Sequence, residues 1–298
     1  IDGLRSMGAT LHCLDNEGFL PLRVDKTQGL RAGEIRLARP ASSQFVSGLV
    51  VAATFADGPV DIVLEQGTPA RPYIDMTLRV LESFGGRGAW SGDTLRVEPS
   101  PLQALAYTVE PDASAASYPL TLAAIHGGKA TVELGTASMQ GDARFAEVLE
   151  RLGARVLQTQ SRTIVEGTGT LRGGAFDLTD MPDMTLTLAV AALHSDAPTH
   201  IRGVEILRHH ESDRLEVAAT ELKKLGAEVE EHDDGLTIRP PTAGVRSGVE
   251  IDTYEDHRVA MAFAMAGHVG IRDPKCVGKT YPAYFDHLQQ TGMVVLRT

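Results

Sequence analysis

Apolar and polar residues follow one another along this chain in patterns that predict alternating helices and strands. Leu215, Ala218, Leu222 and Leu225 recur three or four residues apart, which places them on one face of a helix. Residues 228–231 and 236–239 alternate between apolar and polar, as expected of two short strands that follow this helix. This combination favours an α/β fold.

One combination recurs: a helix that ends in an apolar residue and a glycine, followed by two short strands around a polar turn. Glycine is expected just past a helix end, where φ is positive. The spacings between these glycines are 77, 68, 73 and 66 residues, a period near seventy. The glycines are Gly8, Gly85, Gly153, Gly226 and, in weaker form, Gly292.

A second helix recurs in phase with the first and contains mostly small apolar residues. Its four copies begin near Ser42, Ser114, Asp183 and Asp256. They are apolar nearly all round, as in residues 186–193 and 260–266, so we expect them to be buried. Each unit of about seventy residues then holds one buried helix, one amphipathic helix and several strands, which indicates a duplicated α/β subdomain.

The starts of these buried helices carry candidate anion-binding side chains. They are Ser42, Ser43, Gln44, Asp183, His257 and Arg258. Helix N-termini favour anions, so this set points to a phosphate-handling cleft. Serine and aspartate are also the ordinary N-caps of helices, an alternative that the pattern leaves open. Capping does not explain Arg258, because a cation opposes the helix dipole at that end.

Residues 208–214 form the densest group of charged and titratable side chains in the chain. They read Arg-His-His-Glu-Ser-Asp-Arg and directly precede the amphipathic helix. Asp213 and Glu216 are spaced as a capping pair, which puts Glu211 and Arg214 at the helix entrance. Charged residues at helix starts are often only solvated caps, so this stretch alone does not define a site.

Composition narrows the possible functions. A length of 298 residues suggests two domains, and a net charge of −11 excludes a general nucleic-acid surface. Any anionic substrate must therefore be held by a local group of arginines and lysines. Cys13 and Cys276 form neither a disulfide framework nor a metal motif, which favours reduced thiols in the cytoplasm.

The apolar runs and the first residues of the chain bear on location and extent. The longest apolar runs, such as residues 45–56, are too short to span a membrane, and no signal peptide is visible. The chain enters at Ile1 in the middle of a helix pattern, so we expect upstream sequence to be absent.

Eight segments resemble, in order along the whole chain, motifs of the 5-enolpyruvylshikimate-3-phosphate synthase family of enolpyruvyl transferases. They are residues 42–45, 72–75, 112–118, 140–142, 182–183, 211–215, 256–258 and 273–280. The resemblance implies two domains, each built from three repeated units, with roughly the first third absent here. Residues 1–111 would then be the later part of the shikimate-phosphate-binding domain, and residues 112–298 a second domain that carries the phosphoenolpyruvate-binding residues.

The resemblance also implies a reaction, in which the enolpyruvyl group of phosphoenolpyruvate moves to the 5-hydroxyl of shikimate 3-phosphate and phosphate is released. Asp183 would act as base, and Glu211 would handle the methylene proton. Arg214, Arg258 and Lys279 would bind phosphoenolpyruvate. Shikimate 3-phosphate would be held by Ser42, Ser43, Gln44, Tyr73, Asp183 and His210. No metal or other cofactor is implied.

Two residues depart from the family pattern: His210 stands where a lysine is usual, and Ala70 where a serine is usual. Because the absent part carries further substrate contacts, we expect no turnover from the chain alone unless a separate N-terminal fragment is supplied. Two other interpretations stay open. One is the related transferase that acts on a UDP-aminosugar, although Cys13 and Cys276 do not suit its loop cysteine. The other is a non-catalytic homologue that binds a phosphorylated ligand or a partner protein.

Overall fold

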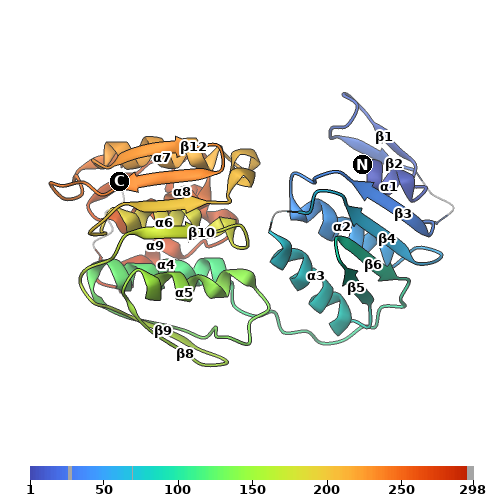
Figure 1. The fold of residues 1–298 in the computed structure, drawn as a ribbon, viewed down its shortest axis with the longest axis horizontal. Helices are drawn as coiled ribbons and strands as arrows, with labels where there is room; N and C mark the ends of the chain where they lie inside the picture. Colours follow the sequence, from blue (N-terminus) through green and yellow to red (C-terminus); the bar gives the residue numbers. More distant parts are fainter. Residues whose placement is uncertain (26–28, 69, 294–298) are drawn as a thin grey trace. The chain divides into compact units, whose positions relative to one another are not determined.

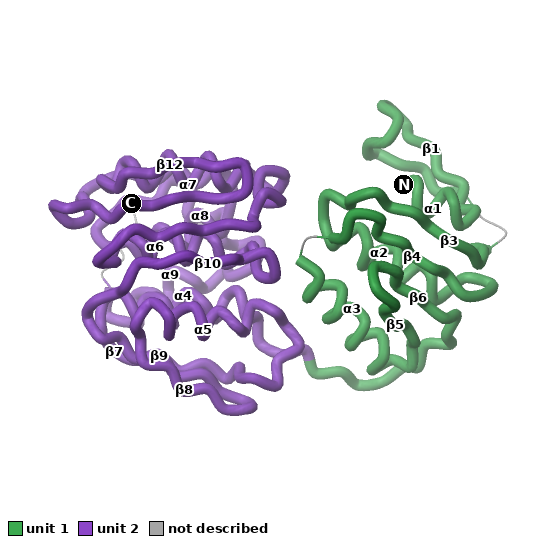
Figure 2. Tube along the Cα trace, viewed as in Figure 1, with its two compact units in different colours: residues 1–108 green, residues 109–298 purple. Residues whose placement is uncertain are grey.

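The computed structural model describes residues 1–25, 29–68 and 70–293, and the chain divides into two compact units (Figure 2). Unit 1 comprises Ile1–Thr108 and unit 2 comprises Val109–Thr298. The sequence placed a domain boundary between residues 111 and 112, three residues later. Within the described part of the chain, every helix is too short or too polar to cross a membrane.

Unit 1 is organised around a four-stranded sheet with the order β3-β4-β6-β5 (Figure 1). The strands β3 and β4 are parallel and are joined through helix α2, whereas β5 and β6 form an antiparallel hairpin after α3. The elements of unit 1 are α1 (Asp2–Ser6), β1 (Leu11–Cys13), β2 (Leu22–Val24), β3 (Gly33–Leu37), α2 (Ser43–Ala53), β4 (Val60–Leu64), α3 (Arg71–Ser83), β5 (Arg87–Ser91) and β6 (Thr94–Glu98).

Unit 2 contains a sheet of the same kind, with the order β10-β11-β13-β12, and two smaller sheets. Its first elements are α4 (Ala113–His126), β7 (Gly128–Val132), η1 (Gly141–Arg144), α5 (Phe145–Arg151), β8 (Arg155–Gln158), β9 (Thr163–Gly167), β10 (Gly174–Asp177), η2 (Pro182–Met184), α6 (Thr185–Ala192), β11 (Thr199–Arg202) and η3 (Glu205–His209). The chain continues through α7 (Arg214–Lys224), β12 (Glu228–His232), β13 (Gly235–Arg239), β14 (Val249–Ile251), α8 (His257–Phe263), η4 (Ala264–Ala266), β15 (Val269–Ile271), η5 (Pro274–Lys279) and α9 (Tyr284–Gln290).

The repeat predicted from the glycine spacing is confirmed. Each predicted glycine follows a helix, and their φ angles are all positive: 87° at Gly8, 87° at Gly85, 102° at Gly153, 98° at Gly226 and 96° at Gly292. Pairs of antiparallel strands follow the first four glycines, namely β1 with β2, β5 with β6, β8 with β9 and β12 with β13. Residues 294–298, which follow the fifth glycine, lie outside the described part of the chain.

The predicted burial of the small-residue helices is confirmed in unit 2. All eight residues of α6 are buried, and α6 lies against both α4 and α8 (Figure 1). For α2 in unit 1 the prediction is wrong on one face. There Phe45 and Val51 are 62% and 45% exposed, and Phe55, two residues past the end of α2, is 64% exposed. The opposite face of α2 packs into the core of unit 1, while the described residues leave this outer face open.

Candidate functional site

The predicted residues of unit 2 come together at one edge of its main sheet. The parallel strands β10 and β11 end side by side, and Asp183 follows the first while Glu211 and Arg214 follow the second. The carboxyl ends of parallel strands are where open α/β sheets bind their ligands. Arg258, in the first turn of α8, and Lys279, at the end of η5, complete the group. The hydrogen bonds described below join all of these side chains.

Arg214 is the centre of this charge cluster and is only 2% exposed. Its Nε donates to Asp256 Oδ2 at 2.8 Å, and its Nη2 donates to Asp256 Oδ1 at 3.3 Å and to Glu211 Oε2 at 2.8 Å. Its Nη1 donates to Asp183 Oδ1 and to His210 Nδ1, both at 3.0 Å. A guanidinium has five N–H groups, so every donor of Arg214 is engaged by a side chain.

Asp183 links the two guanidinium groups of the cluster. One of its oxygens accepts from Arg214, and the other accepts from Arg258 Nη2 at 2.8 Å. Charge-assisted hydrogen bonds of this kind are among the stronger ones in proteins. A buried tyrosine, Tyr118 of α4, also interacts with Arg258, and burial raises the pKa of Tyr118 to about 12. The tyrosine hydroxyl therefore stays protonated at neutral pH.

Glu211 lies between Arg214 and Lys279. Its Oε1 accepts from Lys279 Nζ at 2.5 Å, and its Oε2 accepts from Arg214. Burial alone would raise the pKa of the Glu211 carboxyl, but the hydrogen bond from Lys279 and the charge of Arg214 outweigh burial and lower the pKa to about 2. Glu211 is therefore ionised at neutral pH in this arrangement.

His210 contributes a neutral ring. Burial and the positive charge of Arg214 lower the pKa of His210 below its ordinary value. Because Arg214 can only donate, His210 Nδ1 accepts this hydrogen bond, and the proton of the neutral ring then sits on Nε2. At this position the cluster thus has an N–H donor without a full positive charge.

Asp256 is a central residue of the cluster that the sequence did not single out as functional. It is fully buried, accepts from Arg214 and Ser212, and caps α8 by accepting the Arg258 backbone N–H at 2.9 Å. Its hydrogen bonds and the charge of Arg214 outweigh burial and lower its pKa. The sequence marked Asp256 as a cap residue and as part of the family-like segment 256–258, which predicts the capping bond but not the ion pair with Arg214.

The predicted residues of unit 1 form a separate group at the matching edge of the other sheet. The strands β3 and β4 end together, and the Glu65 N–H donates to the Leu37 carbonyl at 3.0 Å. Ser42 Oγ accepts the Gln44 backbone N–H at 3.2 Å as the N-cap of α2, and Ser43 is buried beside it. Tyr73 lies in the first turn of α3, where Ala70 occupies the cap position with φ +54°.

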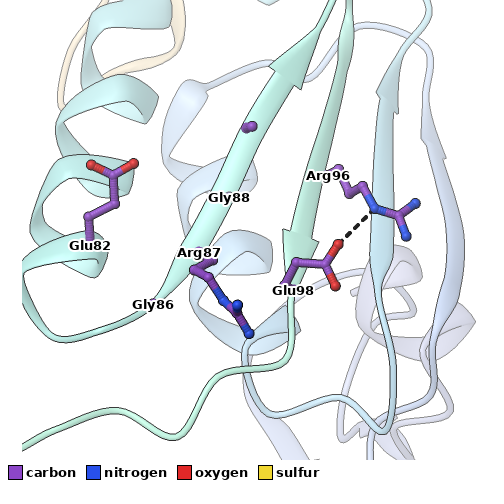
Figure 3. Close-up of a pocket in the computed structure, with 7 residues that line it drawn as sticks. Glu82, Gly86, Arg87, Gly88, Arg96 and Glu98 are labelled. Atoms are coloured by element: carbon purple, nitrogen blue, oxygen red, sulfur yellow. Dashed lines mark hydrogen bonds and ion pairs between the residues drawn. The ribbon is translucent and has the colours of Figure 1, made fainter.

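A hollow of about 260 Å³ in unit 1 is lined by other residues (Figure 3). Glu82, Arg87, Arg96 and Glu98 contribute charged side chains to its wall. Arg96 donates to Glu98 at 2.8 Å, so part of that charge is neutralised locally. The hollow contains no predicted site residue, and its lining offers no set of groups suited to catalysis.

Metal binding finds no support in the described part of the chain, where no three or more His, Cys, Asp or Glu side chains are arranged to hold an ion. The cations and carboxylates of unit 2 neutralise one another instead. Such a cluster can accept an anionic ligand when the ligand replaces Asp183 or Glu211 as a partner of the cations. Among the described residues, Lys279 is the most accessible of the three cations, with 58% of its side chain exposed.

Comparison with known proteins assigns the chain and its fold to one family. A sequence profile of EPSP synthase (3-phosphoshikimate 1-carboxyvinyltransferase) matches residues 1–288. The chain therefore belongs to the EPSP synthase family, and the predicted α/β fold of repeated units is confirmed.

Two relatives and one solved structure illustrate the similarity. The chain is 42% identical to the chloroplastic 3-phosphoshikimate 1-carboxyvinyltransferase 1 of Nicotiana tabacum. This match includes 97% of the present chain and 59% of that relative. It is 40% identical to the enzyme of the same name from Vibrio vulnificus, covering 97% and 68%. The EPSP synthase structure from Acinetobacter baumannii superimposes with a TM-score of 0.77 at 26% identity, covering 97% and 69%. The chain thus spans 59% of the tobacco relative's length.

Proposed function

We propose that the protein to which this chain belongs transfers the enolpyruvyl group of phosphoenolpyruvate to the 5-hydroxyl of shikimate 3-phosphate. The observation that carries this proposal is the cluster in unit 2, where Arg214, Arg258 and Lys279 alternate with Asp183 and Glu211. Three cations can hold the carboxylate and phosphate of phosphoenolpyruvate, while two carboxylates can move protons. Membership of the family supports the same reaction.

Phosphoenolpyruvate would bind by exchanging partners within the cluster. Every side-chain N–H of Arg214 is engaged, so an anion that binds this guanidinium must displace one of its present partners. We infer that the anion also replaces Glu211 at Lys279. The contact between Lys279 and Glu211 is the most accessible place for this exchange. Loss of the lysine contact would raise the pKa of Glu211 from its resting value of about 2, which allows Glu211 to carry the proton that the methylene carbon needs.

The chemistry then follows as an addition and an elimination. Asp183 takes the proton of the 5-hydroxyl while the methylene carbon is protonated, and the substrate oxygen bonds to the central carbon of phosphoenolpyruvate. In the second step the bond from that carbon to the phosphate oxygen breaks, a methyl proton is returned to the protein, and the double bond forms again. The three cations stabilise the negative charge that develops on the departing phosphate.

In unit 1, shikimate 3-phosphate would be bound through the start of α2, which carries Ser42, Ser43 and Gln44. The hydroxyl of Ser42 accepts a backbone N–H but keeps its own proton to donate to a phosphate oxygen. In unit 2, the ring N–H on His210 Nε2 would supply a neutral hydrogen bond at a position where the family resemblance implies a lysine. Ala70 offers no hydroxyl at the start of α3.

Two observations favour a second candidate, a non-catalytic homologue that binds a phosphorylated ligand. One is the neutral ring of His210 in place of an ammonium group, and the other is the absence of a hydroxyl at Ala70. If the charge of the usual lysine is needed in the transition state, restoring it with His210→Lys will increase turnover.

The cytoplasmic location expected from the cysteine pattern stays a prediction.

Phosphate release in the presence of both substrates tests the proposal. The chain is assayed alone and together with the N-terminal segment of a relative such as the Vibrio vulnificus enzyme. We expect release only when the segment and both substrates are present, and a loss of roughly a hundredfold or more in Lys279→Met. Lys223→Met, an exposed lysine of α7, is the matched control. A folded, assembled protein that binds shikimate 3-phosphate but never releases phosphate would support the non-catalytic candidate.

A further inference from the structure

Helix α7 contacts the connection between β14 and α8 at two points. Arg214 lies at the start of α7, and Glu221 follows seven residues later, so both side chains project from the same face of the helix. Arg214 reaches Asp256, whereas Glu221 reaches Asp252 and Tyr254. The second contact is separate from the charge cluster, and the reaction proposed above does not use it.

Glu221 is fully buried, and its carboxylate is well satisfied. Its Oε1 accepts the Tyr254 hydroxyl at 2.9 Å and pairs with Lys224 Nζ at 2.7 Å, while its Oε2 accepts the Asp252 backbone N–H at 3.2 Å. Lys224 also donates to Asp252 Oδ2 at 2.7 Å. A buried carboxylate with this many partners makes a specific link between two elements rather than filling space.

The connection that Glu221 holds has an unusual backbone. Tyr254 and Glu255 are consecutive non-glycine residues with φ angles of +54° and +58°. L-residues rarely adopt this conformation, because Cβ then approaches the carbonyl oxygen, and it persists only where surrounding contacts enforce it. The next residue is Asp256, which holds Arg214 and caps the helix that carries Arg258. The geometry of the cluster therefore depends on this turn.

We propose that Glu221 is a positioning residue of the anion site. By binding the Asp252 N–H before the left-handed turn and the hydroxyl of Tyr254 in its first residue, Glu221 maintains this turn and so orients Asp256 and Arg258 toward Arg214 and Asp183. The expected effect of Glu221 on catalytic turnover rests on the function proposed above. Its expected effect on the backbone turn at Tyr254 and Glu255 does not. Glu221 itself contacts none of the residues proposed to bind substrate.

Hydrogen exchange on the full chain tests the structural half of this proposal. The reporters are the backbone N–H groups of Asp256, Arg258 and Ala260, which donate to Thr253, to the Asp256 side chain and to the Asp256 carbonyl. In Glu221→Gln and in the milder Tyr254→Phe we expect these amides to exchange about tenfold faster or more, while those of the β12–β13 hairpin stay unchanged. Glu216→Gln, an exposed carboxylate on the same helix, is the matched control.

Two results would overturn the proposal. One is unchanged exchange at the three amides in both variants. The other is faster exchange spread evenly over unit 2, because that would make Glu221 a residue of general stability. If Glu221→Gln does not fold, Tyr254→Phe still decides, since it removes one hydroxyl from a residue that is 44% exposed.

Steady-state kinetics of the chain assembled with the N-terminal segment of a relative test the expected effect of Glu221 on catalysis. Tyr254→Phe should lower kcat/KM for phosphoenolpyruvate about tenfold and leave KM for shikimate 3-phosphate within about twofold, because the displaced residues belong to the phosphoenolpyruvate side of the cluster. Values equal to those of Glu216→Gln would contradict the positioning role. If even the unsubstituted assembly has no turnover, the proposed function has failed, whereas the exchange data still judge the role of Glu221 in the turn.

Discussion

The main sheets of the two units share one strand order and differ in the chemistry at their edges. In each, two parallel strands are followed by helices and then by an antiparallel hairpin. After these strands, unit 1 has the hydroxyl and amide groups of Ser42, Ser43 and Gln44 beside charged residues such as Glu65, whereas unit 2 has a hydrogen-bonded cluster of carboxylates and guanidinium groups. The comparison teaches that the scaffold is set by a repeated pattern, while the chemistry depends on a few loop residues placed on it.

The helices that follow the first strand in each sheet show a second difference. Both α2 and α6 are apolar nearly all round, yet α6 is buried on all sides and α2 has an open outer face. Helix α6 packs against α4 and α8, whereas α2 packs against α3 and α1, and these neighbours leave the outer face of α2 exposed. Burial therefore depends on which elements are present and not on the hydrophobic pattern alone.

The largest effect that separates the units should come from Arg214→Ala. This change leaves three carboxylates near a buried site without their shared cation, and breaking a buried ion pair typically costs about 3–5 kcal/mol. The matching change at a helix start of unit 1, Ser42→Ala, removes a single cap and should cost about 1 kcal/mol. Denaturant unfolding of both variants checks the difference, and a loss below about 1 kcal/mol for Arg214→Ala would contradict the central position of this residue.

Core truncations should separate α6 from α2 by a smaller amount. Leu188→Ala, at a fully buried position of α6, should destabilise by about 2–5 kcal/mol, while Phe55→Ala, at an exposed position two residues past the end of α2, should change stability by no more than about 0.5 kcal/mol. Thermal unfolding checks the pair. A cost for Phe55→Ala comparable to that of Leu188→Ala would mean that the outer face of α2 is covered in solution.

Much of this difference was readable from the sequence, and part of it was not. The glycine period and the polar helix starts predicted the repeated units, because a positive φ after a helix and a capping side chain are local requirements. The helix starts pointed to Asp183, Glu211, Arg214 and Arg258, and the family resemblance added Lys279. The role of Asp256 and the complete engagement of Arg214 depend on which loops meet across the sheet edge, and the open face of α2 depends on absent neighbours. The hydrophobic periodicity of the sequence predicts neither the contacts between these loops nor the open face of α2.

The third difference concerns the residues just past α6 and α2. Here we expect the stability of unit 2 to depend on pH through a partly buried histidine. His194 lies just past α6, and Phe55 holds the corresponding place after α2. Burial, together with the charge of His126, lowers the pKa of His194 to about 4. Because this pKa is below the unfolded value of about 6.5, the unfolded chain takes up the proton first. The contribution to the stability of unit 2 is therefore full above about pH 6.5 and falls toward pH 4.

Unfolding transitions of the full chain and of His194→Gln between about pH 7.5 and pH 4.5 measure this dependence. We expect the loss of stability on acidification to be smaller in His194→Gln than in the unsubstituted chain. The same loss in both proteins would show that other groups cause the acid sensitivity.

The proposed reaction depends most on one event, in which phosphoenolpyruvate replaces Glu211 as the partner of Lys279. Proton uptake on phosphoenolpyruvate binding tests this exchange. Calorimetric titrations of the assembled protein in two buffers of different ionisation enthalpy give the number of protons bound per ligand. The account predicts an uptake that grows as the pH falls from about 7.5 to 5.5 and that is reduced in Glu211→Gln, because the pKa of Glu211 rises once Lys279 turns to the ligand. Equal uptake in both proteins would contradict it.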